Sequence, residues 1–194
     1  MTPEQHRWTE ALLNAPTNGA SAVTAYQDHL APGVEASNAM AQADLHRVTE
    51  IADRFQTVAE KYGLPWCLLA AIASRESRCG SVLVDGWGDN HHAFGIMQVD
   101  ARYHGIEGSS DPKSLEHIDQ ATGILASGLA EVMSLHQDWE DPCLLKGAIV
   151  AYNSGTHNVQ TKYGMDIGTT GNDYGSDVVA RAKYYLATLY GIEP

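Results

Sequence analysis

Apolar residues recur at helical spacing along most of the chain, which predicts a mainly α-helical protein. Over residues 39–62 they are separated by charged residues, and Gly63 follows as a stop signal, so we predict one amphipathic helix there. Pro65 suits the first turn of the next helix, whose body is nearly apolar on all sides and is therefore predicted to lie buried at the centre. Three further helices are predicted at about 117–136, 142–153 and 173–190.

Two stretches depart from the helical pattern. Residues 1–33 combine a short helical pattern with turn-rich segments, and we interpret them as an irregular N-terminal lead-in. In the second stretch Val82 and Val84 alternate with other residues and the run 94–99 is apolar, which predicts a small β-hairpin. The expected fold class is mainly α (α+β), with one helical domain over residues 34–194 around a buried central helix.

Composition and charge limit the possible partners. The 194 residues are 44% hydrophobic, which is ample for a substantial core. The chain has no apolar run of about eighteen residues and no recognisable signal peptide at its start, so we expect no membrane span, although a removed signal would leave the same pattern. Twelve basic against 24 acidic residues give a net charge of -12, which argues against nucleic acid or an anionic membrane as partner.

The three cysteines do not predict a disulfide framework. Cys67 and Cys79 are expected on one helix, about 18 Å apart by helical rise, whereas a disulfide needs Cα atoms within about 7 Å. At most, Cys143 pairs with one of them.

One glutamate stands where a charge is costly. Leu68, Ile72 and Glu76 fall on one face of the predicted buried helix, so Glu76 ends an apolar stripe. Burial disfavours the charged form, and we therefore expect a raised pKa and a protonated Glu76 near neutral pH, the state that a general acid needs. The alternative is a solvated or salt-bridged glutamate, because Arg75 and Arg78 are close in sequence.

Aspartates follow this glutamate in polar, glycine-rich loops. Asp85, Asp89 and Asp100 all lie within the next 24 residues of the chain. A glutamic acid in an apolar setting with aspartates nearby is the combination that glycoside hydrolysis requires. Taken alone, Asp89 and Asp100 would more often cap turns.

The histidines do not indicate a metal site. His91 and His92 are too close in sequence for a paired site on a helix, and no HExxH or CxxC spacing occurs. The GWGDNH segment is at best a weak match to a phosphate-binding loop, since it lacks the lysine. We expect no metal and no organic cofactor.

Several linked segments of the chain together resemble one enzyme family. In chain order they read RESRCG, GWGDNHHAFGIMQVD, HIDQATGIL, LKGAIVAYNSG, MDIGTTGNDY and DVVARAKYY. From about Gly33 to Tyr185 the chain resembles the goose-type lysozymes, which are related in fold to the soluble lytic transglycosylases. The resemblance implies a lysozyme-like fold with the β element beside an active-site cleft. It also implies hydrolysis, with inversion, of the β-1,4 bond between N-acetylmuramic acid and N-acetylglucosamine in bacterial peptidoglycan.

The resemblance also implies roles for individual residues. Glu76 matches the general acid, and Asp89 and Asp100 match aspartates thought to position the attacking water. Substrate contacts are implied for Gln98, His104, Tyr152 and Asn153.

The family implies further expectations, and two alternatives stay open. We expect a secreted monomer that acts in antibacterial defence on peptidoglycan, with chitin oligosaccharides as a second candidate substrate. The alternatives are a lytic transglycosylase that forms 1,6-anhydro products and a non-catalytic saccharide-binding protein.

The chain departs from its family in three ways. None of its cysteines matches the disulfides of the bird members, and His91-His92-Ala93 replaces a stretch that is usually glycine and asparagine. The third departure is the acidic balance, because many lysozymes are basic and are attracted to anionic cell walls.

The acidic balance predicts an unusual response to salt. Raising the ionic strength from about 0.02 M to about 0.2 M screens attraction between opposite charges, and this chain has no such attraction to an anionic wall to lose. We expect that salt over that range does not suppress wall lysis, followed by turbidity, as it would suppress lysis by a basic lysozyme. A loss of activity on this change of ionic strength would contradict the expectation.

Overall fold

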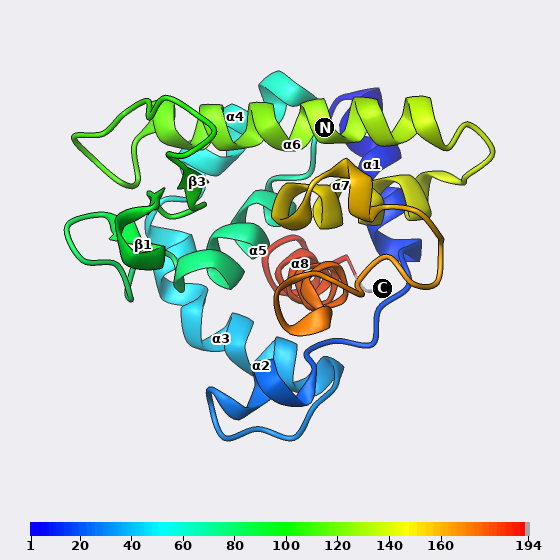
Figure 1. Cartoon of the computed structure of the whole chain (residues 1–194), viewed down its shortest axis with the longest axis horizontal. Helices are drawn as coiled ribbons and strands as arrows, with labels where there is room; N and C mark the ends of the chain where they lie inside the picture. Colours follow the sequence, from blue (N-terminus) through cyan, green and yellow to red (C-terminus); the bar gives the residue numbers. More distant parts are fainter. Residues whose placement is uncertain (193–194) are drawn as a thin grey trace.

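Helix α5 (Trp66–Ser77) runs through the middle of the molecule (Figure 1), and ten of its twelve residues are buried. The structure, a computed structural model, describes residues 1–192. The predicted central and buried position of this helix is confirmed. It follows from a sequence that is apolar on every side, because such a helix has no face suited to water.

The other helices surround α5. They are α1 (Pro3–Asn14), α2 (Ala22–Tyr26), α3 (Val34–Glu50), α4 (Ala52–Tyr62), α6 (Leu115–Leu135), α7 (Asp141–Ser154) and α8 (Tyr174–Tyr190). Short 3-10 turns lie at Asp89–His91, Thr156–Asn158 and Thr170–Asn172. Helix α8 packs against α5 and α3, and α6 packs along α7. The three helices predicted at 117–136, 142–153 and 173–190 are thus confirmed as α6, α7 and α8.

The single helix predicted over residues 39–62 is wrong. The chain forms two helices that meet at Ile51, whose backbone (φ -124°, ψ 20°) is not helical. Both halves contact α5, but α3 packs mainly on α8 and α4 also packs on α6, so the bend lets each half reach a second neighbour of its own. Neither glycine nor proline marks this bend, and periodicity alone therefore misses it.

The N-terminal residues are more regular than predicted. Residues 1–33 contain α1 and α2, and α1 begins with a capping box in which Thr2 and Gln5 bond each other's backbone N–H at 2.9 and 3.1 Å. Trp8 and Leu12 are buried in the main hydrophobic core, and α1 packs on α7. The expectation of an irregular lead-in is therefore corrected, while the domain boundary at residue 33 stays a prediction.

The β element is a three-stranded antiparallel sheet with the order β1-β2-β3 within the described residues. Its strands, β1 (Trp87–Gly88), β2 (Ala93–Phe94) and β3 (Val99–Asp100), have two residues each. The run 94–99 is not one strand, because Gly95 and Gln98 have positive φ and reverse the chain between β2 and β3. Val82 and Val84 are exposed and lie outside the three strands.

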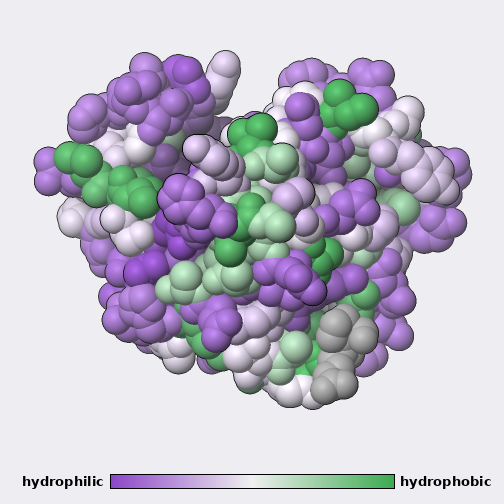
Figure 2. Space-filling model, turned by 90° about the horizontal axis from the view of Figure 1, so that it is seen from below, coloured by the Kyte–Doolittle hydropathy of each residue, from purple (hydrophilic) through white to green (hydrophobic). Residues whose placement is uncertain are grey.

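The surface and the cysteines agree with a chain that relies on packing. Hydrophilic side chains cover much of the face seen in Figure 2, with hydrophobic ones in small groups between them. Cys67, Cys79 and Cys143 are free, and Cys79 lies beyond the end of α5 rather than on it as predicted. None of the helices within residues 1–192 is long and apolar enough to cross a membrane.

The turn after β2 depends on a glycine. Gly95 has a φ of +77°, and a Cβ at this position would lie 2.2 Å from the ring of buried His117. Gly95→Ala should lower the free energy of unfolding by roughly 2–4 kcal/mol, since it combines a left-handed backbone with overpacking. Chemical denaturation measures this loss. Gly105→Ala is the control, because a Cβ there meets nothing within 4 Å, and an equal effect of both changes would contradict the packing argument.

Candidate active site

Glu76 lies near the C-terminal end of α5, at the end of the stripe formed by Leu68 and Ile72, both fully buried. Its side chain is itself largely removed from water, and this burial raises its pKa to about 7. The charge of Arg75 and a hydrogen bond act in the opposite direction and are weaker. Glu76 thus keeps its proton up to about pH 7, in agreement with the raised pKa that the sequence predicts.

The hydrogen bond comes from Tyr174, the first residue of α8. The Tyr174 hydroxyl donates to Glu76 Oε1 at 2.5 Å, and Tyr174 is 1% exposed. Burial and the nearby Glu76 raise the pKa of this tyrosine well above its ordinary value, so it stays a donor. The sequence analysis missed Tyr174, since nothing local distinguishes a tyrosine that begins a helix from an ordinary core residue.

Neither nearby arginine pairs with Glu76. Arg75 contacts Asp173 at 2.9 Å and Asp177 at 2.7 Å, both at the start of α8, while Arg78 binds acidic residues of α3 and of the loop before it. Within residues 1–192, Glu76 therefore has no ion pair, and the salt-bridged alternative is not supported.

The turn between β2 and β3 is held beside Glu76 by three other elements. Ser77 Oγ donates to the Ile96 carbonyl at 2.7 Å, and the Tyr152 hydroxyl donates to the Met97 carbonyl at 2.6 Å. The Met97 N–H donates to Nε2 of His117 on α6 at 3.1 Å. Burial lowers the pKa of His117 to about 4, so the ring is neutral and accepts this bond at pH 7. Helices α5, α6 and α7 thus fix the sheet next to the end of α5.

Tyr152 lies near Glu76, whereas Asn153 bonds to the loop before α8. Burial raises the pKa of Tyr152 well above its ordinary value, and the charge of Glu76 adds to this effect. The Asn153 amide bonds Thr170 twice, donating to its hydroxyl at 3.1 Å and accepting from its N–H at 3.0 Å. Asn153 therefore anchors the segment that leads into α8.

Asp89 and Asp100 form a second cluster around Arg102. Asp100 lies in β3 and accepts from Arg102 Nη2 at 2.6 Å, and the same nitrogen is 3.5 Å from Oδ2 of Asp89, just after β1. The hydrogen bond from Arg102 lowers the pKa of Asp100. The sequence analysis missed Arg102, although it is two residues from Asp100.

Asp89 sits in an unusual backbone turn. Asp89, Asn90 and His91 have φ values of 46°, 53° and 64°, so three successive non-glycine residues are left-handed. Such conformations are costly and persist where the surroundings impose them, often at functional sites. Of the stretch 91–93, only His91 has this left-handed backbone, because His92 is already right-handed with a φ of -94°.

The remaining two predicted residues flank the sheet. Gln98 folds back onto it, donating from Nε2 to the Gly95 carbonyl at 2.8 Å. His104 is exposed, and its backbone N–H donates to the Asp100 carbonyl at 3.0 Å. The structure thus places Tyr152 near Glu76, and Asp89 near Asp100. Of the other three predicted residues, His104 bonds the Asp100 carbonyl through its backbone, whereas the side chains of Asn153 and Gln98 bond Thr170 and Gly95.

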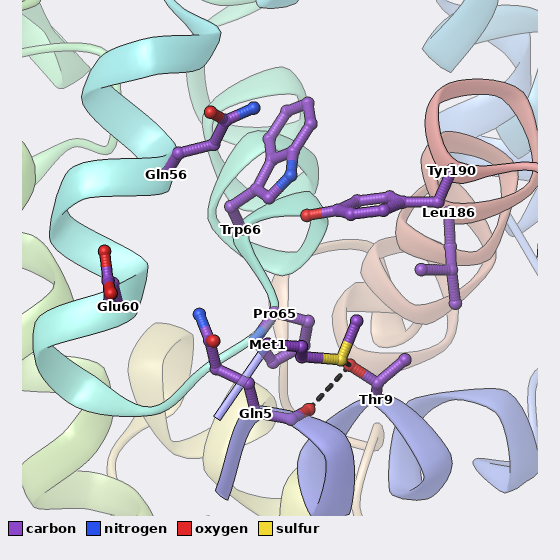
Figure 3. A pocket seen from close by; sticks show the side chains of 9 residues that line it. All are labelled: Met1, Gln5, Thr9, Gln56, Glu60, Pro65, Trp66, Leu186 and Tyr190. Atoms are coloured by element: carbon purple, nitrogen blue, oxygen red, sulfur yellow. Dashed lines mark hydrogen bonds between the residues drawn. The ribbon is translucent and has the colours of Figure 1, made fainter. Parts of the chain in front are cut away.

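A hollow elsewhere on the molecule is separate from these groups. It is lined by Trp66, Pro65 and Tyr190 among other residues, at the opposite end of α5 (Figure 3). Trp66 precedes Glu76 by ten residues, or about 15 Å along the helix. No group of three or more potential metal ligands occurs in the described part of the chain.

Comparison with known proteins identifies the family. The sequence model of the family described as Lysozyme g matches residues 11–188. The chain belongs to the lysozyme g family. Lysozyme g of Casuarius casuarius is 45% identical over 174 residues, covering 87% of this chain and 91% of that protein. Lysozyme g of Epinephelus coioides is 42% identical over 185 residues, covering 90% and 94%.

A third relative has a different name. A "Glycine, glutamate and proline-rich protein" of Lottia gigantea is 42% identical over 173 residues, which cover 85% of this chain and 41% of that protein. The resemblance to goose-type lysozymes is confirmed, as is the mainly helical lysozyme g fold with its small sheet. This lysozyme g chain is a glycoside hydrolase.

The contact between Tyr174 and Glu76 predicts a pKa shift. The Tyr174 hydroxyl stabilises the ionised form of Glu76, so Tyr174→Phe should raise the pKa of Glu76 further above 7 and extend its protonated range to higher pH. NMR titration of the labelled glutamate measures this pKa without reference to activity.

Tyr185→Phe is the matched control for this measurement. It removes a buried hydroxyl from the same helix, one that donates to the Ala41 carbonyl at 3.0 Å. The pKa of Glu76 should be unchanged in this variant. A downward shift in Tyr174→Phe would overturn the interpretation of the contact.

Proposed function

We propose that this lysozyme g hydrolyses the β-1,4 bond between N-acetylmuramic acid and N-acetylglucosamine in bacterial peptidoglycan. The observation that carries the proposal is Glu76, a carboxyl whose pKa burial raises to about 7 and which has no ion pair within the described residues. A carboxyl that keeps its proton up to about pH 7, near a sheet with two further carboxyl groups at its edge, suits general acid catalysis.

In the proposed reaction Glu76 donates its proton to the glycosidic oxygen as the bond to the anomeric carbon breaks. A water held by the cluster of Asp89 and Asp100 attacks that carbon from the opposite face and gives up a proton to a carboxylate. The anomeric configuration is thereby inverted, as in enzymes whose carboxyl groups stand roughly 6.5–9.5 Å apart. The old C–O bond breaks and the new one forms with the help of proton transfers between side chains, water and sugar, so the proposal requires no metal or organic cofactor.

The other predicted residues are proposed to shape the sugar groove. Tyr152 and Asn153 are engaged with Met97 and Thr170, which suits them to form a fixed wall rather than to move with substrate. His104 has an exposed side chain and is the better candidate for direct contact with sugar. Gln98 bonds the sheet on which both aspartates are mounted.

Hydrolysis is favoured over transglycosylation by the two aspartates. A lytic transglycosylase works without a water-positioning aspartate, because a substrate hydroxyl closes the 1,6-anhydro ring. Here Asp89 and Asp100 are both bound to one guanidinium beside the sheet. Mass spectrometry of a peptidoglycan digest separates the two reactions, since each hydrolytic product is one water heavier than its anhydro counterpart.

The setting of this activity follows from its substrate. Because peptidoglycan belongs to bacteria, we propose that the protein acts outside the cell in antibacterial defence. We further propose that it acts as a monomer. Chitin oligosaccharides share the N-acetylglucosamine unit and are the second substrate to be tested. A non-catalytic saccharide-binding protein would have no need of a protonated glutamate at this place.

Replacement of the acid tests the proposal directly. Glu76→Gln should remove most wall lysis, because the amide cannot donate a proton to the leaving oxygen. It should also stabilise the protein at pH 8, by roughly 1–3 kcal/mol. In the folded protein the pKa of Glu76 is about 7, above its ordinary value of 4.5. The unaltered protein therefore loses free energy of unfolding as the pH rises from 4.5 to about 7, whereas the amide of the variant does not ionise and the variant avoids this loss.

Two measurements in parallel distinguish a chemical from a structural defect. Wall turbidity reports activity, and denaturation at pH 4 and pH 8 reports stability, with the gain expected at pH 8 and not at pH 4. Near-normal lysis by a folded Glu76→Gln variant would falsify the proposed mechanism.

A further inference from the structure

Arg102 uses nearly all the hydrogen-bonding capacity of Asp100. Asp100 Oδ1 accepts from the Arg102 backbone N–H at 2.8 Å and from Nε at 2.9 Å. Its Oδ2 accepts from Nε at 3.1 Å and from Nη2 at 2.6 Å. A carboxylate has about four lone-pair sites, so this carboxylate has little capacity left for another donor.

Asp89, by contrast, has unused hydrogen-bonding capacity. Its Oδ2 meets Nη2 of Arg102 at 3.5 Å, and its Oδ1 has no hydrogen bond within residues 1–192. The side chain of Asp89 is 56% exposed, against 26% for Asp100. Asp89 is therefore the aspartate with acceptor sites open to solvent.

We propose that Arg102 is a positioning residue that divides the work of the two aspartates. It locks Asp100 in place and, through its outer nitrogen, orients Asp89, which holds the attacking water. This inference rests on the proposed function of Glu76 and deepens it, because it assigns different roles to two residues that the sequence treats alike.

An arginine suits this task for two reasons. Asp89 and Asp100 contact the same guanidinium. Two carboxylates so close to each other repel, and a cation between them offsets that repulsion. The planar guanidinium also presents several donors in a fixed fork, which a lysine ammonium does not. The contact with Asp100 spans two residues of one turn, so it orients the carboxylates without contributing to the distant core.

The arrangement predicts a pH signature as well as a rate effect. The titratable and charged groups that face Asp100 and Arg102 are Asp89, His92 and Tyr103. Of the groups around Asp100, Arg102 lowers its pKa the most. Without Arg102 the pKa of Asp100 would be higher, so Asp100 would be protonated at a higher pH. The acid limb of the pH–activity profile would therefore shift to higher pH.

The first test compares Arg102→Gln with a matched control. Arg7→Gln breaks a similar surface pair, in which Arg7 binds Asp141 through two nitrogens at 2.7 Å, on α1 and α7 away from the sheet. For Arg102→Gln we expect kcat on peptidoglycan oligomers to fall about tenfold to a hundredfold. KM and Tm should change little, and the acid limb of the pH–activity profile should shift to higher pH. Arg102→Lys should recover part of kcat, and Arg7→Gln should match the unaltered enzyme.

The second test is a double-mutant cycle. If Arg102 acts by orienting Asp89, Arg102→Gln should cause little further loss in an Asp89→Asn background, and Asp89→Asn should lose more activity than Asp100→Asn. An unchanged kcat and pH profile in Arg102→Gln, or fully additive losses in the cycle, would overturn the inference. An inactive Glu76→Gln with a normal Arg102→Gln would overturn only this inference, whereas an active Glu76→Gln would overturn the proposed function beneath it.

Discussion

Two buried carboxyls at the contact between α5 and α8 take opposite protonation states, and the chemistry of the site depends on that contrast. Burial alone would raise the pKa of both. For Asp177 the charges of Arg181 and Arg75 reverse the effect and lower the pKa, whereas for Glu76 burial prevails. The difference lies in the placement of the arginines. Arg75 and Arg181 both bind Asp177, so burial remains the largest effect on Glu76 and raises its pKa.

The same contact also holds the group that touches the glutamate. Arg75 binds Asp173 and Asp177, which lie on either side of Tyr174 in the sequence. Arg75 and Glu76 are adjacent in α5, and their partners Asp173 and Tyr174 are adjacent at the start of α8. Because these ion pairs are almost completely buried, breaking one would leave an uncompensated charge in the core. The tyrosine is consequently held at its place by interactions that are costly to lose.

Local sequence predicts much of this framework. The helices α6, α7 and α8 and the stripe that leads to Glu76 are recognisable because periodicity and caps are properties of neighbouring residues. Tyr174 is not recognisable, since it is 98 residues from Glu76 and meets it only through the packing of α5 on α8. The bend at Ile51 is not recognisable either, because it also depends on the packing of helices that are distant in the sequence. Arg102 is close to Asp100, but an arginine in a polar turn is ordinary, and only the fold brings Asp89 to it.

The acidic surface places a further demand on this site. With a net charge of -12, the chain has no long-range attraction to an anionic polymer. If the protein acts on cell walls as proposed, its hold on them therefore comes from short-range contacts, hydrogen bonds and apolar packing. A saccharide site that works in this way needs walls fixed before the sugar arrives, since ordering them on binding would cost affinity. The three bonds that pin the turn between β2 and β3, from Ser77, Tyr152 and His117, provide that rigidity. Rigid walls thus compensate for the missing electrostatic attraction.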